Sequence, residues 1–245
     1  MKKFLILLFG LISYALFLAA FLYAIGFVGD RFVPYTVNSG GSTSENAWII
    51  NILLLSVWAL PHSIMARPAF KKWWTTIFSP AVERSIYVFQ SSALLFLIYY
   101  NWQPMTTKVW NIEGALYIQI IEVIFWSGWL IVLISTFLIN HFHLFGLLQI
   151  FENFKNKTLS SPKFKKNLFY KLVRHPIMSG FIVAFWATPV MTQGQFLFAA
   201  VSTVYIFIAV KFLEERDLVN LHGEAYTNYQ KETPMIIPFT KFKKK

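Results

Sequence analysis

The sequence contains no cysteine and few charged residues. Of its 245 residues, 56% are hydrophobic, 19% are aromatic and 13% are Asp, Glu, Lys or Arg, which is about half the charged share of an average soluble protein. The absence of cysteine excludes disulfides, thiolate metal sites, iron–sulfur clusters and a cysteine nucleophile. The shortage of charge excludes a disordered chain, and it also excludes an ordinary cytosolic domain, because a soluble fold of this size could not bury so much apolar surface.

Long uncharged runs account for this apolar composition. Residues 4–29, 46–66, 85–107, 123–140 and 175–210 contain no Asp, Glu, Lys or Arg. A helix needs about 20 apolar residues to cross about 30 Å of hydrocarbon, so each run predicts at least one span. The last run contains Pro189 and Gly194, which favour a turn, and we interpret it as a hairpin of helices 177–191 and 195–213. The sequence therefore predicts an all-α, polytopic membrane bundle of about six spans, with five and four as alternative counts.

The first run is interpreted as a membrane helix rather than a signal peptide. It has 26 residues, whereas the apolar region of a signal peptide has roughly 7–15. We expect the whole chain, 1–245, to form a single domain. Its first part, 1–140, would carry four spans, and 141–245 would carry the hairpin and a basic C-terminal tail, of which residues 233–245 are expected to lie at the membrane interface.

The basic residues lie almost entirely on one side of the predicted spans. With six spans, 20 of the 22 Lys and Arg residues fall on the side of the two termini, and only Arg31 and Lys108 fall on the other. The positive-inside rule then places both termini in the cytoplasm. Topology and attraction to the lipid bilayer thus explain the net charge of +11, and no nucleic-acid partner is expected.

Ionisable residues are predicted to collect at the cytoplasmic ends of the spans. Such groups are costly at membrane depth and usually face a bundle interior or a wet cavity. The set comprises His62, Glu83, Arg84, His141, His143, Arg174, His175, Glu214, Glu215, Arg216 and Asp217. Headgroup anchoring by Arg84 and Arg174, capping by His62 and ordinary helix-end charge are the structural alternatives. No metal is expected, because His141 and His143 are two residues apart and would point to different faces of a helix.

Two motifs carry a resemblance to a known group of enzymes. Residues 174–180, Arg-His-Pro-Ile-Met-Ser-Gly, resemble the R-H-P-x-Y-x-G signature of isoprenylcysteine carboxyl methyltransferase-like membrane enzymes, with Met178 in place of the Tyr. The second half of that signature, a glutamate pair followed by Leu, Gly and Tyr, matches Glu214-Glu215 and residues 218–229. No Rossmann, P-loop, G-x-S-x-G or H-E-x-x-H motif competes with this interpretation.

Further segments narrow the resemblance. Residues 21–30, 62–68, 83–85, 135–149 and 185–189 are similar to those of the bacterial methanethiol S-methyltransferases, a membrane branch related to NnrU-like proteins. The likeness covers roughly residues 4–240. It implies methyl transfer from S-adenosylmethionine to methanethiol, giving dimethyl sulfide, at the cytoplasmic face of the bacterial inner membrane. Methylation of a lipid-soluble acceptor, such as an isoprenylcysteine carboxylate or a phospholipid amine, and a non-catalytic NnrU-like assembly factor are the alternatives.

The resemblance also implies which residues bind the cofactor. Arg174 and His175 would hold the carboxylate or ribose of S-adenosylmethionine, and one glutamate of the pair would bind its ammonium or ribose hydroxyls. The complete set of expected cofactor-binding residues is His143, Gln149, Arg174, His175, Pro176, Gly180, Glu214, Glu215 and Tyr226. Pro176 suits the first turn of a helix, and Gly180 would allow a close backbone approach.

The chemistry of this transfer calls for a base. A thiolate and a sulfonium become two neutral thioethers, so a dry pocket favours the transition state, but a thiol with a pKa of about 8.5 is mostly protonated at neutral pH. Imidazole is a suitable proton acceptor. His62 is the first candidate, oriented or tuned by Glu83 and Arg84, and His141 is the second.

Overall fold

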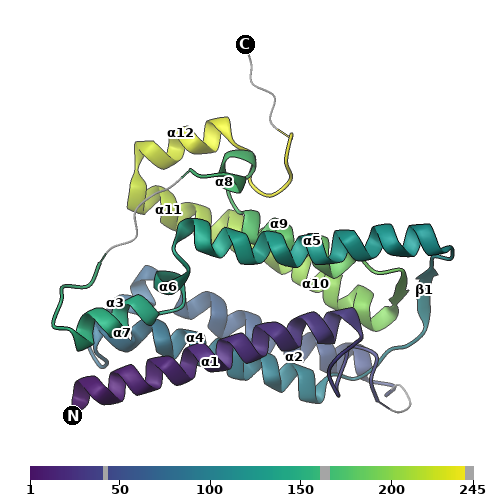
Figure 1. Ribbon diagram of the computed structural model, residues 1–245, viewed down its shortest axis with the longest axis horizontal. Coiled ribbons are helices and arrows are strands. Elements are labelled where there is room, and N and C mark those ends of the chain that lie inside the picture. Colours follow the sequence, from purple (N-terminus) through teal and green to yellow (C-terminus); the bar gives the residue numbers. More distant parts are fainter. Residues whose placement is uncertain (41–43, 161–165, 241–245) are drawn as a thin grey trace. The chain divides into compact units, whose positions relative to one another are not determined.

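Helices form almost all of the structure. The computed structural model describes residues 1–40, 44–160 and 166–240. In this part of the chain, five helical segments are long and apolar enough to cross a membrane. They are α1 (Lys2–Gly29), α2 (Ala47–Met65), α4 (Pro80–Asn101), α5 (Ala115–Ile139) and the continuous run Gln193–His222. The predicted all-α, polytopic membrane bundle is confirmed (Figure 1).

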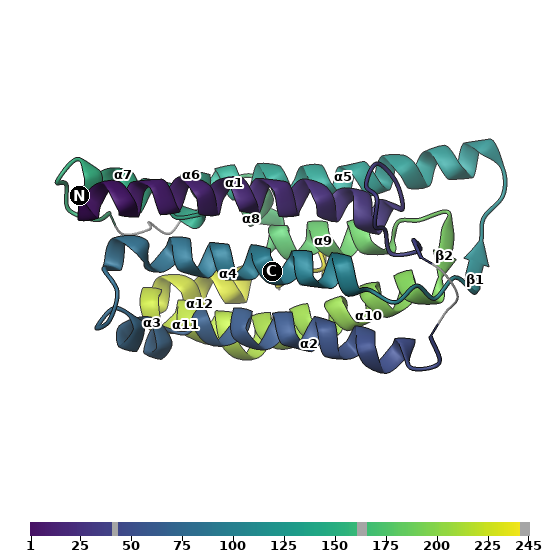
Figure 2. The ribbon, with the colours of Figure 1, turned by 90° about the horizontal axis from the view of Figure 1, so that it is seen from below.

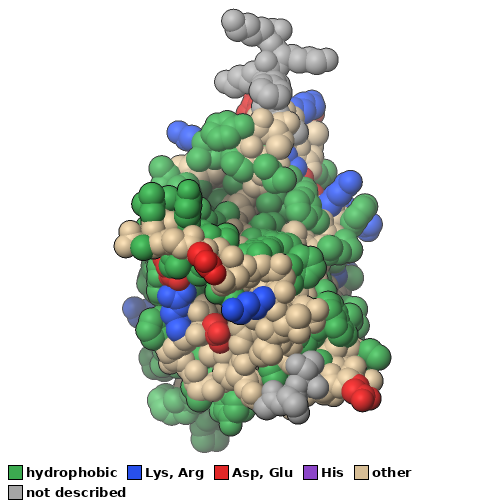
Figure 3. All heavy atoms as spheres, turned by 90° about the vertical axis from the view of Figure 1, so that its right-hand side faces the viewer, with side chains coloured by type: hydrophobic (Ala, Val, Ile, Leu, Met, Phe, Trp, Pro, Cys, Tyr) green, Lys and Arg blue, Asp and Glu red, His purple; other side chains and the backbone are tan. Residues whose placement is uncertain are grey.

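The outward surface of the long helices is apolar. Leu22 on α1, Ile49 on α2 and Leu116 on α5 are each about 60% exposed or more, at 63%, 60% and 65%. Figure 3 looks at the end of the molecule near β1, where charged side chains lie among backbone and polar atoms and hydrophobic side chains surround them. Large exposed apolar surfaces are rare on soluble monomers, so the apolar surface of the long helices fits contact with lipid tails.

The predicted hairpin near the end of the chain is present, but its first arm is short. Helix α9 (Pro176–Trp186) has 11 residues and is about 16 Å long, which is less than the hydrocarbon thickness. It ends before Pro189, and the short strand β2 (Val190–Thr192) follows. The predicted end at residue 191 is therefore wrong, because Pro189 disfavours helical conformation in the residue before it. Among the described residues there are five full-length spans rather than six.

The second arm is longer than predicted and contains a π-helix. Helix α10 (Gln193–Ile208) continues into the π-helical segment η1 (Ala209–Glu214) and then into α11 (Glu215–His222). The residue Gly223, with a φ of +57°, ends α11, and α12 (Glu224–Glu232) follows. A π-helix is rare and often marks a functional position in a helix.

The chain forms two compact units. Unit 1 contains residues 1–107, 140–162 and 192–197, and unit 2 contains residues 108–139, 163–191 and 198–245.

In unit 1, α1 packs against α4 and against α7 (Leu147–Phe154), and α2 packs against α4. The buried face of α1 includes the small residues Gly10, Ser13 and Ala20, which let neighbouring helices approach closely. A Cβ atom on Gly10 would lie 2.5 Å from the Ile150 side chain of α7. The short helices α3 (Pro68–Trp74) and α6 (His141–Leu144) complete this unit.

In unit 2, α5 packs along α9, and the two helices lie side by side in both ribbon views (Figures 1 and 2). A Cβ atom on Gly180 would lie 2.7 Å from the carbonyl oxygen of Gly128, so the two backbones touch where the helices cross. The strand β1 (Lys108–Asn111) pairs with β2, and the short helix α8 (Phe169–Leu172) precedes α9. This crossing fixes the start of α9, where the two sequence motifs meet.

Candidate functional site

The two halves of the sequence motif form a buried ion pair in unit 2. Arg174 lies just before α9, and Glu215 begins α11. The Arg174 Nε donates to Glu215 Oε1 at 2.9 Å, and its Nη2 donates to Oε2 at 2.6 Å. Both side chains are less than 10% exposed, at 7% and 8%. This two-point geometry is the strongest that an arginine and a carboxylate can adopt, and it joins residues 41 positions apart.

Glu215 also accepts three further hydrogen bonds. His175 Nε2 lies 2.6 Å from Oε1, the Tyr226 hydroxyl donates to Oε1 at 2.6 Å, and Gln230 Nε2 donates to Oε2 at 2.6 Å. A carboxylate offers about four lone-pair sites. With Arg174 these donors fill both oxygens, so Glu215 holds the surrounding elements together and has no capacity left for a ligand. We refer to Arg174, His175, Glu214, Glu215, Tyr226 and Gln230 as the Arg174 cluster.

The remaining donors of Arg174 hold the end of α12 and the chain that follows it. Arg174 Nη1 donates to the carbonyl oxygens of Gln230, at 3.2 Å, and of Thr233. The backbone N–H groups of Arg174 and His175 donate to the carbonyl oxygens of Pro234, at 2.9 Å, and Met235, at 3.0 Å. Residues 233–236, here called the strap, are therefore tied along the start of α9.

The strap differs from the expectation that the tail is interfacial from residue 233 onward. Thr233, Pro234 and Ile236 are buried, and Ile236 packs with Ile206 and Val210. Exposure begins only at Ile237. Residues 233–236 are thus held by the protein itself, because the carbonyl oxygens of Thr233, Pro234 and Met235 accept from Arg174 and His175, and that of Ile236 accepts from Ser179. Residues 241–245 of the predicted basic tail lie outside the described residues.

His175 lies between two carboxylates. Its Nδ1 is 3.5 Å from Glu214 Oε1, and its Nε2 is 2.6 Å from Glu215 Oε1. Burial by itself lowers the pKa of His175, but Glu214 and then Glu215 outweigh burial and raise the pKa to about 9. His175 is therefore a cation at neutral pH and cannot act as a base there.

The two glutamates of the motif have different surroundings. Glu214 ends the π-helix, and its side chain is 42% exposed, whereas the Glu215 side chain is 8% exposed. Glu214 thus offers an accessible carboxylate beside the imidazolium of His175. Burial, followed by the hydrogen bond to Glu215, raises the pKa of Tyr226, so its hydroxyl remains a neutral donor.

The structure places Pro176 and Gly180 in helix packing. Pro176 occupies the first turn of α9 and is buried, as expected for a residue without an N–H group. Gly180 lies against Gly128 of α5, and a Cβ atom there would also lie 2.8 Å from the Val132 side chain. The close backbone approach predicted for Gly180 is therefore an approach to α5.

In unit 1, His62 lies in a group of aromatic and hydroxyl side chains. Its Nδ1 is 3.1 Å from Ser91 Oγ, its Nε2 is 2.9 Å from the Tyr87 hydroxyl, and its ring stacks on Trp58 with centroids 4.2 Å apart. The Arg84 guanidinium lies over the Tyr87 ring, 4.9 Å from its centroid. Arg84 and His62 therefore contact the same tyrosine.

Three other residues of unit 1 were predicted to take part in catalysis: Arg84 and Glu83 on α4, and His141 on α6. Arg84 Nε donates to the Leu144 carbonyl oxygen at 2.6 Å, and half-buried Glu83 lies in the first turn of α4. In the described part of the chain no ion pair to Glu83 is found. His141 is buried, its Nε2 is 2.8 Å from the Tyr14 hydroxyl, and burial lowers its pKa.

His143 and Gln149 are neighbours in unit 1. Gln149 Nε2 donates to the His143 carbonyl oxygen at 3.0 Å, and burial is the main cause that lowers the pKa of His143. The Gln149 Oε1 atom is buried and has no hydrogen-bond partner among the described residues. The described residues contain no group of three His, Cys, Asp or Glu side chains positioned to hold a metal.

Sequence reasoning missed Gln230 and the strap. Gln230 stands four residues after Tyr226, so both lie on one face of α12, and both reach Glu215. That spacing was the available signal for Gln230. The strap acts through backbone carbonyl groups, which carry no sequence signal.

Comparison with known proteins gives relatives over nearly the whole chain. The chain is 48% identical to methanethiol S-methyltransferase 1 of Bradyrhizobium diazoefficiens, over 97% of its own length and 83% of that protein. It is 46% identical to the methanethiol S-methyltransferase of Mycobacterium tuberculosis, over 98% of each. A more distant similarity, 24% identity over 81% of this chain and 74% of the other protein, links it to nurim of Danio rerio. No family model and no solved structure matches the chain.

Proposed function

Because the chain belongs to the methanethiol S-methyltransferase family, we propose that it transfers a methyl group from S-adenosylmethionine to methanethiol and yields dimethyl sulfide. The observation that carries the proposal is the identity of 46–48% over almost all of the chain. The Arg174 cluster supports it, because it joins the two motif halves in one buried assembly with an accessible acidic group.

The residues of the cluster fit a ligand that carries an amino-acid group. Glu214 presents an accessible carboxylate, which can bind an ammonium, whereas Glu215 is filled by protein donors. Arg174 and His175 are likewise engaged by Glu215 and the strap. We therefore assign direct cofactor contact to Glu214 and positioning to Arg174, His175, Glu215, Tyr226 and Gln230.

The bound cofactor supplies a methyl group on a positively charged sulfur. The protein must remove the thiol proton, align the thiol sulfur with that methyl carbon and keep water away. With S-adenosylmethionine bound, attack of the thiolate sulfur on the methyl carbon would break the carbon–sulfonium bond, and both charges would disappear. His62 is proposed as the proton acceptor, with Tyr87 and Ser91 fixing its ring.

The small size of the proposed acceptor, methanethiol, limits how the protein can select it. Methanethiol has only two heavy atoms, and small ligands gain at most about 1.5 kcal/mol per heavy atom, so binding should be weak and selection should depend on pocket size. We expect ethanethiol to react poorly and a prenylcysteine not to react. The distribution of Lys and Arg supports a cytoplasmic location of the basic connections, and we propose the bacterial cytoplasmic membrane as the site of action.

The proposal is tested by measuring dimethyl sulfide in the headspace above purified membranes that receive S-adenosylmethionine and methanethiol. Production that requires both compounds and is absent from membranes without the protein supports the proposal. Binding of S-adenosylhomocysteine to the purified protein, measured by calorimetry, is the second readout. Efficient methylation of a prenylcysteine or of phosphatidylethanolamine would contradict the assigned acceptor, and absence of any adenosyl ligand binding would contradict the function.

A further inference from the structure

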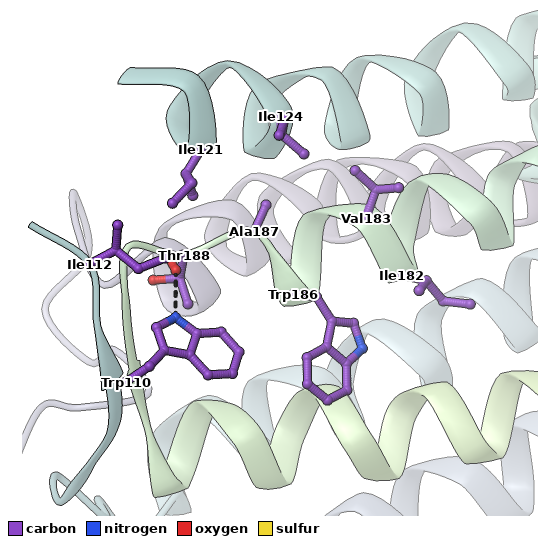
Figure 4. A pocket seen from close by; sticks show the side chains of 9 residues that line it. All are labelled: Trp110, Ile112, Ile121, Ile124, Ile182, Val183, Trp186, Ala187 and Thr188. Atoms are coloured by element: carbon purple, nitrogen blue, oxygen red, sulfur yellow. Dashed lines mark hydrogen bonds between the residues drawn. The ribbon is translucent and has the colours of Figure 1, made fainter. Parts of the chain in front are cut away.

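Unit 2 contains an apolar groove at the far end of α9 from the Arg174 cluster. The groove has a volume of about 480 Å³ and is lined by α5, by the end of α9 and by the strand region (Figure 4). On α9 its lining begins at Ile182, six residues after Pro176, so the groove starts about 9 Å along the helix from the cluster. The volume lies within the range of small-molecule sites, about 300–1,000 Å³.

The lining of the groove consists of hydrocarbon and aromatic surface. Ile121 and Ile124 point in from α5, and Trp110 and Trp186 lie across from them (Figure 4). The Trp110 Nε1 donates to the Thr188 carbonyl oxygen at 3.1 Å, so the polar atom of that indole is already satisfied. The groove therefore suits an alkyl chain.

The position of the groove along α5 indicates which molecule could supply such an alkyl chain. Ile121 and Ile124 stand six and nine residues after Ala115, which is about 9–14 Å from the start of the helix. One leaflet of the hydrocarbon core is about 15 Å thick. A groove at this depth on a membrane-spanning helix meets the acyl chains of the leaflet in which α5 begins, which the positive-inside rule identifies as the outer leaflet.

A cation lies on the same side of the strand as the groove. Side chains two apart in a strand share a face, so Lys108 shares the face of Trp110, and Ile112 continues that alternation. Lys108 is exposed and has no ion pair with any described residue. Asn111 and Glu113 occupy the positions that alternate with Lys108, Trp110 and Ile112. The Asn111 Nδ2 donates to the nearby Glu113 Oε1 at 3.2 Å. Lys108 is thus positioned to attract an anionic headgroup.

We propose that this groove binds one acyl chain of an outer-leaflet phospholipid, with the lipid phosphate at Lys108. The apolar lining, the depth along α5 and the unpaired cation each favour this occupant. The site is independent of the methyl-transfer chemistry, since none of its residues belongs to the Arg174 cluster.

The test uses the full-length protein purified in detergent, with bound lipid measured by native mass spectrometry after addition of phosphatidylglycerol or diacylglycerol. Ile124→Phe should fill the groove and abolish the bound-lipid species. Its matched control is Val123→Phe, a neighbouring change at a more exposed position of α5, which should leave lipid binding unchanged. Thermal unfolding of both variants shows that they are folded.

A second pair of variants tests the headgroup. Lys108→Gln should weaken phosphatidylglycerol binding about fivefold, because one lysine near a lipid surface contributes about 1 kcal/mol. Diacylglycerol, which has no phosphate, should be insensitive to this change, and the exposed Lys211→Gln should affect neither lipid. Equal lipid loss in the two α5 variants, or an effect of Lys108→Gln on diacylglycerol as large as on phosphatidylglycerol, would overturn the proposal.

Discussion

The Arg174 cluster and the His62 group show two different uses of a histidine near membrane depth. In the cluster, both nitrogens of His175 face carboxylates, and the imidazole is held as a cation. In the His62 group, the ring nitrogens lie within hydrogen-bond distance of the hydroxyls of Tyr87 and Ser91, which can either donate or accept. A histidine between carboxylates stabilises structure, whereas a histidine between hydroxyls can change its proton at little cost to its neighbours.

The same contrast separates the two glutamates of the motif. Glu215 is buried and accepts hydrogen bonds from four residues, and Glu214 is exposed enough to meet a ligand. If this distinction is correct, substitutions within the Arg174 cluster should change stability in proportion to burial.

The largest effect is expected for Glu215→Gln. The change leaves Arg174 and His175 buried without their anion, and breaking a buried ion pair costs about 3–5 kcal/mol. Thermal unfolding in detergent should show a large loss of stability, together with loss of methyl transfer. Glu214→Gln is the matched control, for which we expect a clearly smaller loss of stability, because the Glu214 side chain is 42% exposed, but weak binding of S-adenosylhomocysteine. Equal destabilisation by the two changes would remove the distinction between the glutamates.

The next effect is expected for Gly180→Ala. The added Cβ atom would lie 2.7 Å from a backbone oxygen of α5, and overpacking of this kind costs about 1–3 kcal/mol. The measurement is the free energy of unfolding. Gly194→Ala provides the comparison, because its Cβ atom would lie 3.4 Å from the backbone nitrogen of Met105, which is an ordinary van der Waals contact. An unchanged stability of Gly180→Ala would show that the helices can separate there without cost.

A smaller effect is expected from pH. The pKa of His175 is about 9 in the folded protein and about 6.5 in an unfolded chain, so its contribution to stability is complete below pH 6.5 and is lost as the pH rises through 9. Melting temperatures measured from pH 6 to pH 10 should therefore fall at the alkaline end. In Glu214→Gln the fall should begin at lower pH, because an anion that raises this pKa has been removed. Superimposable pH profiles for the two proteins would contradict this account.

The smallest effect on stability, but a large effect on turnover, is expected for His62→Gln. The hydrogen bonds to Tyr87 and Ser91 contribute about 1 kcal/mol each, whereas loss of a general base lowers turnover by about 10²–10⁴-fold. Dimethyl sulfide production between pH 6 and 9 gives the readout, and His141→Gln is the comparison. Near-full turnover at neutral pH by both folded variants would rule out a histidine base.

Much of the fold could be predicted from uncharged runs because bilayer thickness fixes the length of a span. The short first arm of the hairpin was harder to predict, since the 36-residue run contains no charge that marks its turn. Pro189 was the signal, and it ends α9 at Trp186 rather than at residue 191. The π-helix was not predictable, because its hydrogen-bond shift depends on packing and not on residue type.

The candidate site shows a similar division. The proximity of Arg174 and Glu215 could be predicted from the sequence, because both residues belong to one motif and flank one hairpin. The sequence could not predict which of the two glutamates would be buried, because it does not show which of two consecutive helical residues faces the protein interior. The strap was also beyond sequence reasoning, because any residue can offer a carbonyl oxygen.

The strap has a consequence for the order in which the protein is made. The ribosome must add 59 residues after Arg174 before the carbonyl group of Thr233 exists, and 41 before Glu215 does. During that interval a guanidinium stands at the entrance of an apolar hairpin without its anion, which disfavours deep insertion of the first arm alone. The first arm should therefore reach its final position only after the second arm has been synthesised and has supplied Glu215.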